Sequence, residues 1–207
     1  MNPPILIVNL AKSFGGAEVR VIETARHLHA NQTCSVAVLA DSPLCKKLQK
    51  ENLPIFTLPY KRGDPRIASA LSTIIRKNGF RVVDTHNPQS NFWGMLGTKR
   101  AGSASLVTTV HSSRDKTVSY FKTALYDMTV RANYWFGSNF IAVSESVFQY
   151  LLGLSIPPSK IALVKNGLTI PSTPRDDQAR DSIRQQYGYT DDNFVIILVG
   201  RLEPIKG

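Results

Sequence analysis

Long apolar runs and a cysteine framework are both missing from this sequence. Its 207 residues contain no stretch of about 18 apolar residues, so no membrane-spanning helix is expected. Cys34 and Cys45 match no metal-ligand spacing and make no disulfide framework, which favours idle thiols in a reducing compartment. No basic segment precedes the apolar residues 5–10, and that run is too short for a secretory signal. We therefore expect a cytoplasmic chain.

Acidic residues are scarce, and the resulting charge is unevenly placed. The chain has 15 Asp and Glu against 25 Lys and Arg, a net charge of +10, and residues 61–140 alone carry +8. A solvated basic face would explain this excess, and so would an anionic partner such as a phosphate, an acidic glycan or an anionic lipid. None of the recognised nucleic-acid-binding signatures is present, so we expect no nucleic-acid partner.

Short apolar runs alternate with amphipathic stretches along most of the chain. The expected strands are residues 5–10, 35–40, 55–58, 81–86, 105–111, 140–143 and 161–164. The bounded helices are expected at residues 44–51, 65–78, 91–100, 118–136, 145–152 and 182–187, with a further one around Val21 to Leu28. Continuous apolar, β-branched strands are typical of a parallel sheet that helices cover on both faces. The sequence therefore predicts an α/β fold with a Rossmann-like parallel sheet.

The alternation breaks at residues 171–181, which hold two prolines and mixed charges. We interpret residues 1–170 as an N-terminal domain and 171–193 as a linker with a connecting helix. Residues 194–199 are strongly apolar and predict a buried strand, so we interpret 194–207 as the start of a second domain. A last edge strand of the first sheet is the alternative.

Gly15-Gly16 lies between the first expected strand and the helix that follows. Glycine permits close backbone approach, and unpaired N–H groups at a helix start attract anions, so this turn is a candidate anion site. It matches neither the G-x-G-x-x-G fingerprint nor a P-loop, which disfavours a dehydrogenase or an NTPase. A tight turn without a ligand remains the alternative.

Polar clusters follow several expected strands, at the edge where open α/β sheets bind ligands. These clusters are residues 84–91, 111–115, 144–146 and 165–167. Helix capping could explain any one of them, but their recurrence indicates a cleft lined with donors and acceptors. His86 and His111 lie where a strand meets a loop, so these two histidines are the candidates for chemistry. At the end of the chain, Arg201 and Lys206 follow a strand-end glycine and suit a diphosphate.

An ordered set of motifs resembles the retaining glycosyltransferases of family four, which have the two-domain GT-B architecture. In chain order, the motifs are Gly15-Gly16-Ala17-Glu18, Thr85-His86-Asn87, Thr109-Val110-His111-Ser112, Ala142-Val143-Ser144-Glu145-Ser146, Lys160-Ile161 to Asn166-Gly167, and Val199-Gly200-Arg201-Leu202 to Lys206-Gly207. The resemblance implies that the chain is the acceptor-side half of a GT-B enzyme with the first strand of the other half.

The resemblance also implies roles for matched residues. His111 would position the donor sugar as the catalytic residue, and Gly15, Gly16, Arg201 and Lys206 would bind the donor. Neutralising the departing nucleoside diphosphate stabilises the oxocarbenium-like transition state. The residues implied for the acceptor are His86, Asn87, Ser90, Asn91, Ser112, Arg114, Glu145 and Asn166. The resemblance implies no metal and no cofactor beyond the nucleotide sugar, because side chains and helix ends take the place of a metal.

The implied reaction is hexosyl transfer, with retention, from a nucleotide-diphosphate sugar to a glycan or a lipid-linked acceptor in cell-envelope polysaccharide synthesis. The family's paired-glutamate motif is not in the chain, so we expect a fragment that alone transfers no sugar. Two alternatives stay open: a non-catalytic glycan- or anion-binding module, and a GT-B-type nucleotide-sugar epimerase.

The basic middle of the chain also contains many aromatic residues. The cations are Lys99, Arg100, Arg114, Lys116, Lys122 and Arg131, and the aromatics are Tyr120, Phe121, Tyr126, Tyr134, Trp135 and Phe136. This mixture suits peripheral contact with anionic lipid at the inner face of a membrane. The alternative is that the aromatics belong to the core and the cations only to the surface.

Overall fold

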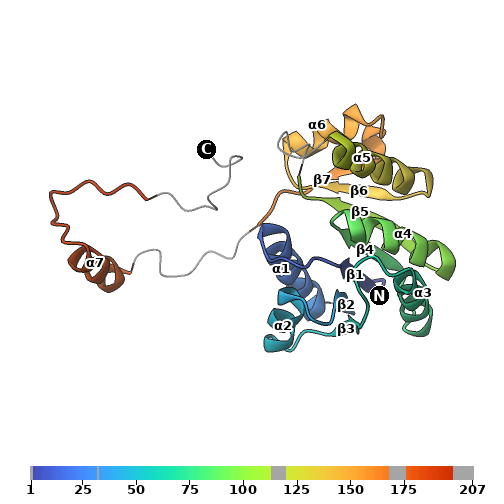
Figure 1. Ribbon diagram of the computed structural model, residues 1–207, viewed down its shortest axis with the longest axis horizontal. Helices are drawn as coiled ribbons and strands as arrows, with labels where there is room; N and C mark the ends of the chain where they lie inside the picture. The colour runs from blue at the N-terminus through green and yellow to red at the C-terminus, as the bar shows by residue number, and fades with distance from the viewer. Residues whose placement is uncertain (1, 32, 113–119, 168–175, 198–207) are drawn as a thin grey trace. The chain divides into compact units, whose positions relative to one another are not determined.

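The computed structural model describes residues 2–31, 33–112, 120–167 and 176–197, and the chain divides into two units, Met1–Asn166 and Gly167–Gly207 (Figure 1). The strands are β1 (Ile5–Asn9), β2 (Cys34–Leu39), β3 (Ile55–Leu58), β4 (Val82–His86), β5 (Ser105–Val110), β6 (Asn139–Ala142) and β7 (Ile161–Leu163). The helices are α1 (Gly16–Asn31), α2 (Pro43–Lys50), α3 (Arg66–Lys77), α4 (Pro88–Ala101), α5 (Tyr120–Trp135), α6 (Glu145–Gly153), the 3-10 turn η1 (Pro158–Lys160) and α7 (Asp177–Gln186). This alternation confirms the predicted α/β class.

The strands of the first unit form one parallel sheet in the order β3-β2-β1-β4-β5-β6-β7. The order reverses between β1 and β4, which lie side by side although α1, β2, α2, β3 and α3 separate them along the chain (Figure 1). In open α/β sheets, ligands bind outside the carboxyl ends of the strands at such a reversal. Asn9, His86 and Thr109 lie in register at this place, on β1, β4 and β5.

Alternate residues of β1 enter hydrophobic clusters on the two faces of the sheet. Leu6 and Val8 pack with residues of α3 and α4, whereas Ile7 packs with residues of α1 and α2. Cys34 and Cys45 belong to the second cluster, and burial raises the pKa of the Cys34 thiol to about 11. The Cys34 thiol is therefore protonated and unreactive at neutral pH, in agreement with the prediction of idle thiols.

Helix α4 begins at Pro88, three residues before the predicted start at residue 91. The Asn87 side chain accepts a hydrogen bond from the Ser90 amide, and proline fits the first turn of a helix. Two glycines let α4 approach its neighbours closely. A Cβ on Gly94 would lie 2.3 Å from Thr85 Cγ2, and one on Gly97 would lie 2.8 Å from Leu71 Cβ. The middle of α4 therefore packs closely against β4 and α3.

The second unit differs from its prediction. Helix α7 begins at Asp177 instead of residue 182, because Asp176 caps it by accepting from the Ala179 amide. The strand predicted at residues 194–199 is not formed at residues 194–197, where Phe194 is 91% exposed, and residues 198–199 lie outside the described residues. A strand needs a neighbouring strand for its hydrogen bonds, and the described part of this unit contains none.

Among the described residues, no helix combines the length and the apolarity that crossing a membrane requires.

Candidate functional site

Four polar side chains form a hydrogen-bonded chain across the carboxyl ends of β4 and β5. Thr109 Oγ1 donates to Asp84 Oδ1 over 2.8 Å, and Asp84 Oδ2 lies 3.1 Å from His86 Nε2. His86 Nδ1 lies 2.7 Å from His111 Nε2. Thr109, Asp84 and His86 are buried, whereas His111 is partly exposed at the open end of the chain. The structure thus brings together the two histidines that the sequence singled out for chemistry.

The protonation of His111 follows from its surroundings. Burial lowers the pKa of His111 to about 3, and the neighbouring His86 and Arg20 act in the same direction while Asp84 opposes them. The His111 imidazole is therefore neutral at neutral pH. Burial also lowers the pKa of Arg20, and Asp84 again acts against this effect.

The carboxylate of Asp84 organises the protons of this chain. A carboxylate oxygen can only accept a hydrogen bond. The hydrogen therefore sits on His86 Nε2, and this N–H donates a hydrogen bond to Asp84. When His86 carries that proton alone, its Nδ1 accepts from the Nε2–H of His111. Neutral His111 then presents its Nδ1 as an acceptor. Such an imidazole can accept a hydrogen bond from a ligand hydroxyl.

A second network joins the end of β1 to the start of α4. The side-chain Nδ2 of Asn87 donates to Asn9 Oδ1 over 3.1 Å, and the backbone N–H of Leu10 donates to Ser90 Oγ over 2.8 Å. Ser90 Oγ in turn donates to Asn87 Oδ1 over 3.1 Å. Asn87 has a φ of 72° and a ψ of 159°, a backbone region that residues other than glycine rarely adopt, so the surrounding bonds hold it in a strained conformation. These bonds hold the loop after β4 in place.

Ser90 and Asn91, both predicted to contact an acceptor, are 0% exposed. The Asn91 amide lies 3.0 Å from the Asn87 carbonyl and 3.1 Å from Thr85 Oγ1, so its polar end is used inside the domain. In the structure, the buried side chains of these two residues hold the loop between β4 and α4 in place. Their contact with an acceptor stays a prediction.

The turn after β1 is open to solvent at both glycines. A Cβ on Gly16 would meet nothing within 4 Å, and one on Gly15 would meet Glu18 Oε2 at an ordinary 3.7 Å. Glu18 is buried and caps its own helix, because its Oε2 accepts from the Gly15 amide and its Oε1 accepts from the Asn9 side chain. Packing in the described chain therefore does not require glycine at residues 15 and 16.

The remaining predicted site residues are spread along the same edge. Asn166 accepts from Arg20 Nη1 over 2.6 Å, which ties the segment after β7 to α1. Glu145 is exposed at the start of α6, where its carboxylate accepts from Gln149, and Ser112 is exposed directly after His111. Arg114, Arg201 and Lys206 lie outside the described residues.

Sequence reasoning missed the residues that support the histidines. Asp84 and Thr109 lie within the polar cluster 84–91 and the motif that begins at Thr109 but were given no role, and Arg20 was not singled out. Asp84 lies two residues before His86 on β4, so both side chains are on the same face of the strand. That spacing could have revealed the pair. The approach of Thr109 and Arg20 depends on the register of β5 and on the position of α1, which the sequence pattern does not give.

Comparison with known proteins places the chain in a family. The sequence model of Glycosyltransferase Family 4 matches residues 14–170. No curated protein matches the chain.

Three solved structures with a similar fold cover most of this chain. A glycosyltransferase from Rickettsia africae is 23% identical with a TM-score of 0.71, and it matches over 92% of this chain and 50% of its own. Anabaena Alr3699/HepE in complex with UDP-glucose is 18% identical with a TM-score of 0.70, over 90% and 50% of the two chains. A UDP-N-acetylglucosamine 2-epimerase is 12% identical with a TM-score of 0.59, over 78% and 47%. The chain thus spans about half the length of these proteins, and the likeness confirms the predicted Rossmann-like fold.

Proposed function

Because this chain belongs to Glycosyltransferase Family 4, we propose that it forms the acceptor-side half of a retaining enzyme. The enzyme transfers a hexosyl group from a nucleotide-diphosphate sugar to a glycan or a lipid-linked acceptor. The observation that carries this proposal is the partly exposed His111, held by His86 at the reversal of the strand order. A solved protein of similar fold, Anabaena Alr3699/HepE, is in complex with UDP-glucose, which supports a nucleotide sugar as the donor.

The chemistry of the site suits the handling of a sugar. Neutral His111 can accept a hydrogen bond from a hydroxyl of the donor sugar and so position the reacting carbon. It adds no positive charge beside a transition state that is itself oxocarbenium-like, where a cation would be repelled. The open turn at Gly15 and Gly16 leaves space for close approach of the sugar or its phosphates, although the Gly15 N–H itself is bonded to Glu18.

An epimerase is the second candidate, because a UDP-N-acetylglucosamine 2-epimerase has a similar fold. That chemistry would need additional carboxylates in the cleft. Beside the histidines, Asp84 and Glu18 both have their carboxylates hydrogen-bonded inside the domain, and elsewhere on this edge Glu145 accepts from Gln149 and Asp41 borders a separate cavity. This arrangement favours transfer.

The test uses the polypeptide that the gene encodes in full, because the proteins of similar fold are about twice as long as this chain. The protein is incubated with UDP-glucose and related nucleotide sugars, with and without a membrane-glycan extract. We expect nucleoside diphosphate release that depends on the extract and falls at least about 100-fold in His111→Ala. The anomeric configuration of the product, read by NMR, tests retention.

His29→Ala, which changes an exposed histidine of α1, is the control for that assay. Conversion of the nucleotide sugar to its epimer, with no transfer to any acceptor, would show that the second candidate is the right one.

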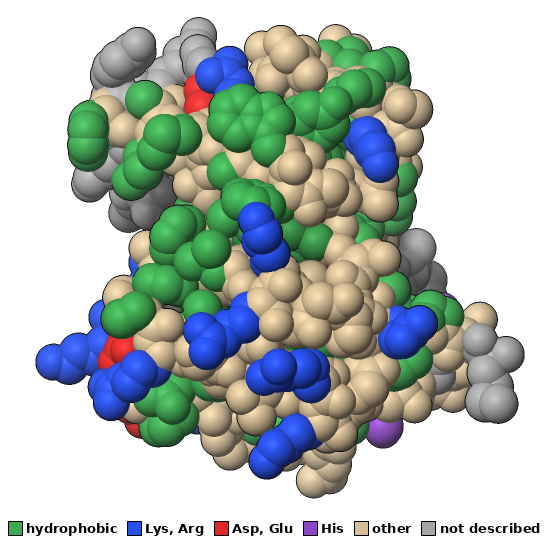
Figure 2. Space-filling view, turned by 90° about the vertical axis from the view of Figure 1, so that its right-hand side faces the viewer, with side chains coloured by type: hydrophobic (Ala, Val, Ile, Leu, Met, Phe, Trp, Pro, Cys, Tyr) green, Lys and Arg blue, Asp and Glu red, His purple; other side chains and the backbone are tan. Residues whose placement is uncertain are grey.

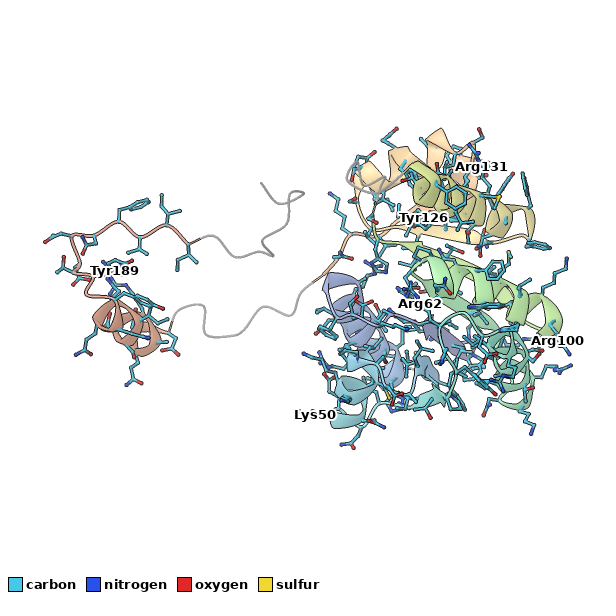
Figure 3. The ribbon with its side chains drawn as sticks, viewed as in Figure 1. Lys50, Arg62, Arg100, Tyr126, Arg131 and Tyr189 are labelled. Carbon is cyan, nitrogen blue, oxygen red and sulfur yellow. The ribbon has the colours of Figure 1, made fainter. Side chains whose placement is uncertain are left out.

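The outer face of α5 supports the proposed contact with an anionic membrane. Large apolar side chains at helical spacing are exposed along it and just beyond its end: Phe121, Leu125, Met128, Trp135 and Phe136. Lys99 lies 4.0 Å over the ring of Phe136, and Arg100 on α4 and Arg131 on α5 are exposed (Figure 3). In Figure 2, hydrophobic side chains gather over the upper part of the molecule and Lys and Arg side chains over the lower part.

The aromatic residues of this region divide between surface and core. Tyr126 and Tyr134 pack against a third hydrophobic cluster, which includes the buried residues Phe140 of β6 and Leu151 of α6, so these two tyrosines are structural. Phe121 and Trp135, in contrast, are 77% and 74% exposed. The side chains of Arg114, Lys116, Tyr120 and Lys122 lie outside the described residues. Co-sedimentation with anionic vesicles tests the contact: Phe121→Ser/Trp135→Ser should bind less than Phe92→Ser, a control on α4. Equal sedimentation with neutral and anionic vesicles would remove the claim.

A further inference from the structure

A cavity of about 620 Å³ lies beside the histidine site, at the carboxyl ends of β2 and β3. Its apolar floor includes Leu39 and Leu58, which end these two strands and are buried. Lys12 from the loop after β1 borders it, and so do Tyr60, Lys61 and Arg62 from the loop after β3. The volume is in the range of pockets that hold small ligands. None of the roles assigned above uses this cavity.

The charge around the cavity is unbalanced. Three cations, Lys12, Lys61 and Arg62, border it against one carboxylate, Asp41. No ion pair joins these cations to any described residue. The next acidic residue along the loop, Asp64, is already paired with Arg66 at 2.6 Å. The cavity therefore has an excess of positive charge that the described chain does not neutralise.

Arg62 gives this excess a specific donor. Its Nε is shielded from solvent and has no hydrogen-bond partner among the described residues, and Arg62 is labelled in Figure 3. A buried guanidinium N–H without an acceptor costs free energy, and no described carboxylate neutralises the charge of this guanidinium. The backbone at Arg62 is fixed, because its carbonyl accepts from Trp93 Nε1 over 3.0 Å. The backbone from which the Arg62 side chain extends towards the cavity lining is thus held in place.

We propose that this cavity is a binding subsite for the phosphate group of a phosphorylated sugar. The guanidinium of Arg62 and the ammonium groups of Lys12 and Lys61 bind the phosphate oxygens, as these groups do in other phosphate sites. The apolar floor and the ring of Tyr60 contact the sugar. A carboxylate would satisfy the charge less completely, because a phosphate monoester carries up to two negative charges.

The position of the cavity makes it part of an acceptor site, a role that rests on the proposed glycosyltransferase function. Strands β2 and β4 both neighbour β1, so the end of β2 lies about 10 Å from the end of β4 at the usual spacing of strands. A phosphorylated acceptor of one or two sugar rings could therefore extend from this cavity to the histidine site.

Isothermal titration calorimetry with the 207-residue chain tests the proposal. The probes are glucose 6-phosphate, glucose, inorganic phosphate and UDP. We expect glucose 6-phosphate to bind and glucose not to bind at the same concentrations. Lys61→Gln/Arg62→Gln should lower the affinity for glucose 6-phosphate roughly 10- to 100-fold, because each substitution removes a charged hydrogen bond to the phosphate and its contribution to the binding free energy. Lys12→Gln, in another loop, should weaken it as well, and provides a second variant should the double variant not fold.

The control is Arg76→Gln/Lys77→Gln, an adjacent basic pair that is exposed in the last turn of α3. It removes the same charge and should change the affinity less than twofold. Three results would overturn the proposal: equal binding of glucose and glucose 6-phosphate, equal binding of inorganic phosphate and glucose 6-phosphate, or equal weakening by the control pair. Displacement of glucose 6-phosphate by UDP would overturn it too, by assigning the cavity to the donor. Because binding alone is measured, a failure of sugar transfer leaves this result unchanged.

Discussion

The carboxyl edge of the sheet contains two regions with opposite environments. In the inner region, Thr85, Ser90, Asn91 and Gly94 are buried. The first three form hydrogen bonds inside the domain, and the missing side chain of Gly94 lets α4 pack closely against β4. In the outer region, Gly15, Gly16, Lys12, Lys61 and Arg62 lie at the surface or border a cavity, and few contacts inside the described chain use them.

This difference separates what the fold needs from what a ligand needs. A substitution in the inner region should lower the free energy of unfolding, because the chain itself loses a contact. A substitution in the outer region should leave stability almost unchanged and reduce ligand binding. Four substitutions, ordered by their expected effect on stability at neutral pH, test this separation.

Gly94→Ala should have the largest effect, a loss of about 3 kcal/mol in the free energy of unfolding. The new Cβ would lie 2.3 Å from Thr85 Cγ2, and Thr85 cannot rotate freely because its Oγ1 donates to the Val107 carbonyl. Urea unfolding measures the loss. Adding Thr85→Ser removes the Cγ2 and should restore much of the stability, while Gly63→Ala, with nothing within 4 Å, is the control. A lack of rescue by Thr85→Ser would place the cause elsewhere.

Ser90→Ala should cost about 2 kcal/mol, because it leaves the buried Leu10 amide without its acceptor. Thermal or urea unfolding measures this loss. Ser103→Ala, at an exposed serine after α4, should change the free energy by less than about 0.5 kcal/mol. If the two serine variants were equally stable, the network at the start of α4 would not support the fold as described.

His111→Asn should have a small effect at pH 7 and a larger one in acid. In the wild type, the unfolded chain takes up a proton at His111 near pH 6.5, whereas the folded chain resists it down to about pH 3. The contribution of neutral His111 to the free energy of unfolding is therefore complete above about pH 6.5. It is lost as the pH falls towards 3, by at most about 1.4 kcal/mol per pH unit.

The Asn variant lacks that penalty and should lose less stability than the wild type between pH 7 and pH 4.5. The difference should be of the order of 2 kcal/mol in urea unfolding. His29→Asn is the matched control for loss of an imidazole on the surface. Parallel pH profiles of the wild type and His111→Asn would contradict the buried, neutral state of His111.

The same division explains how much the sequence could predict. The apolar runs locate the strands within a few residues, and they place Gly15, Gly16, His86 and His111 at or just after strand ends, where the structure has them; the roles of these residues stay predictions. The start of α4 was missed because Asn87-Pro88 resembles a loop until the Asn87 side chain is seen to cap the helix. The strand at residues 194–199 was predicted from apolarity alone, although a strand forms only with a partner. The Arg20 and Thr109 contacts depend on how elements pack together, which local pattern does not specify.

Gly16→Ala should have the smallest effect on stability and is the sharpest test of the outer region. The new Cβ meets nothing within 4 Å, and alanine is a better helix former than glycine, so the free energy of unfolding should stay equal or rise by up to about 1 kcal/mol. If the turn is kept open for a ligand, the same methyl group should weaken binding of a nucleotide sugar by about tenfold or more. Paired urea unfolding and calorimetric titration of the full-length protein with UDP-glucose measure both quantities. If Gly16→Ala changed neither the free energy of unfolding nor the affinity for UDP-glucose, Gly16 would form only a turn. The ligand-binding part of the outer region would then be limited to the cations around the cavity.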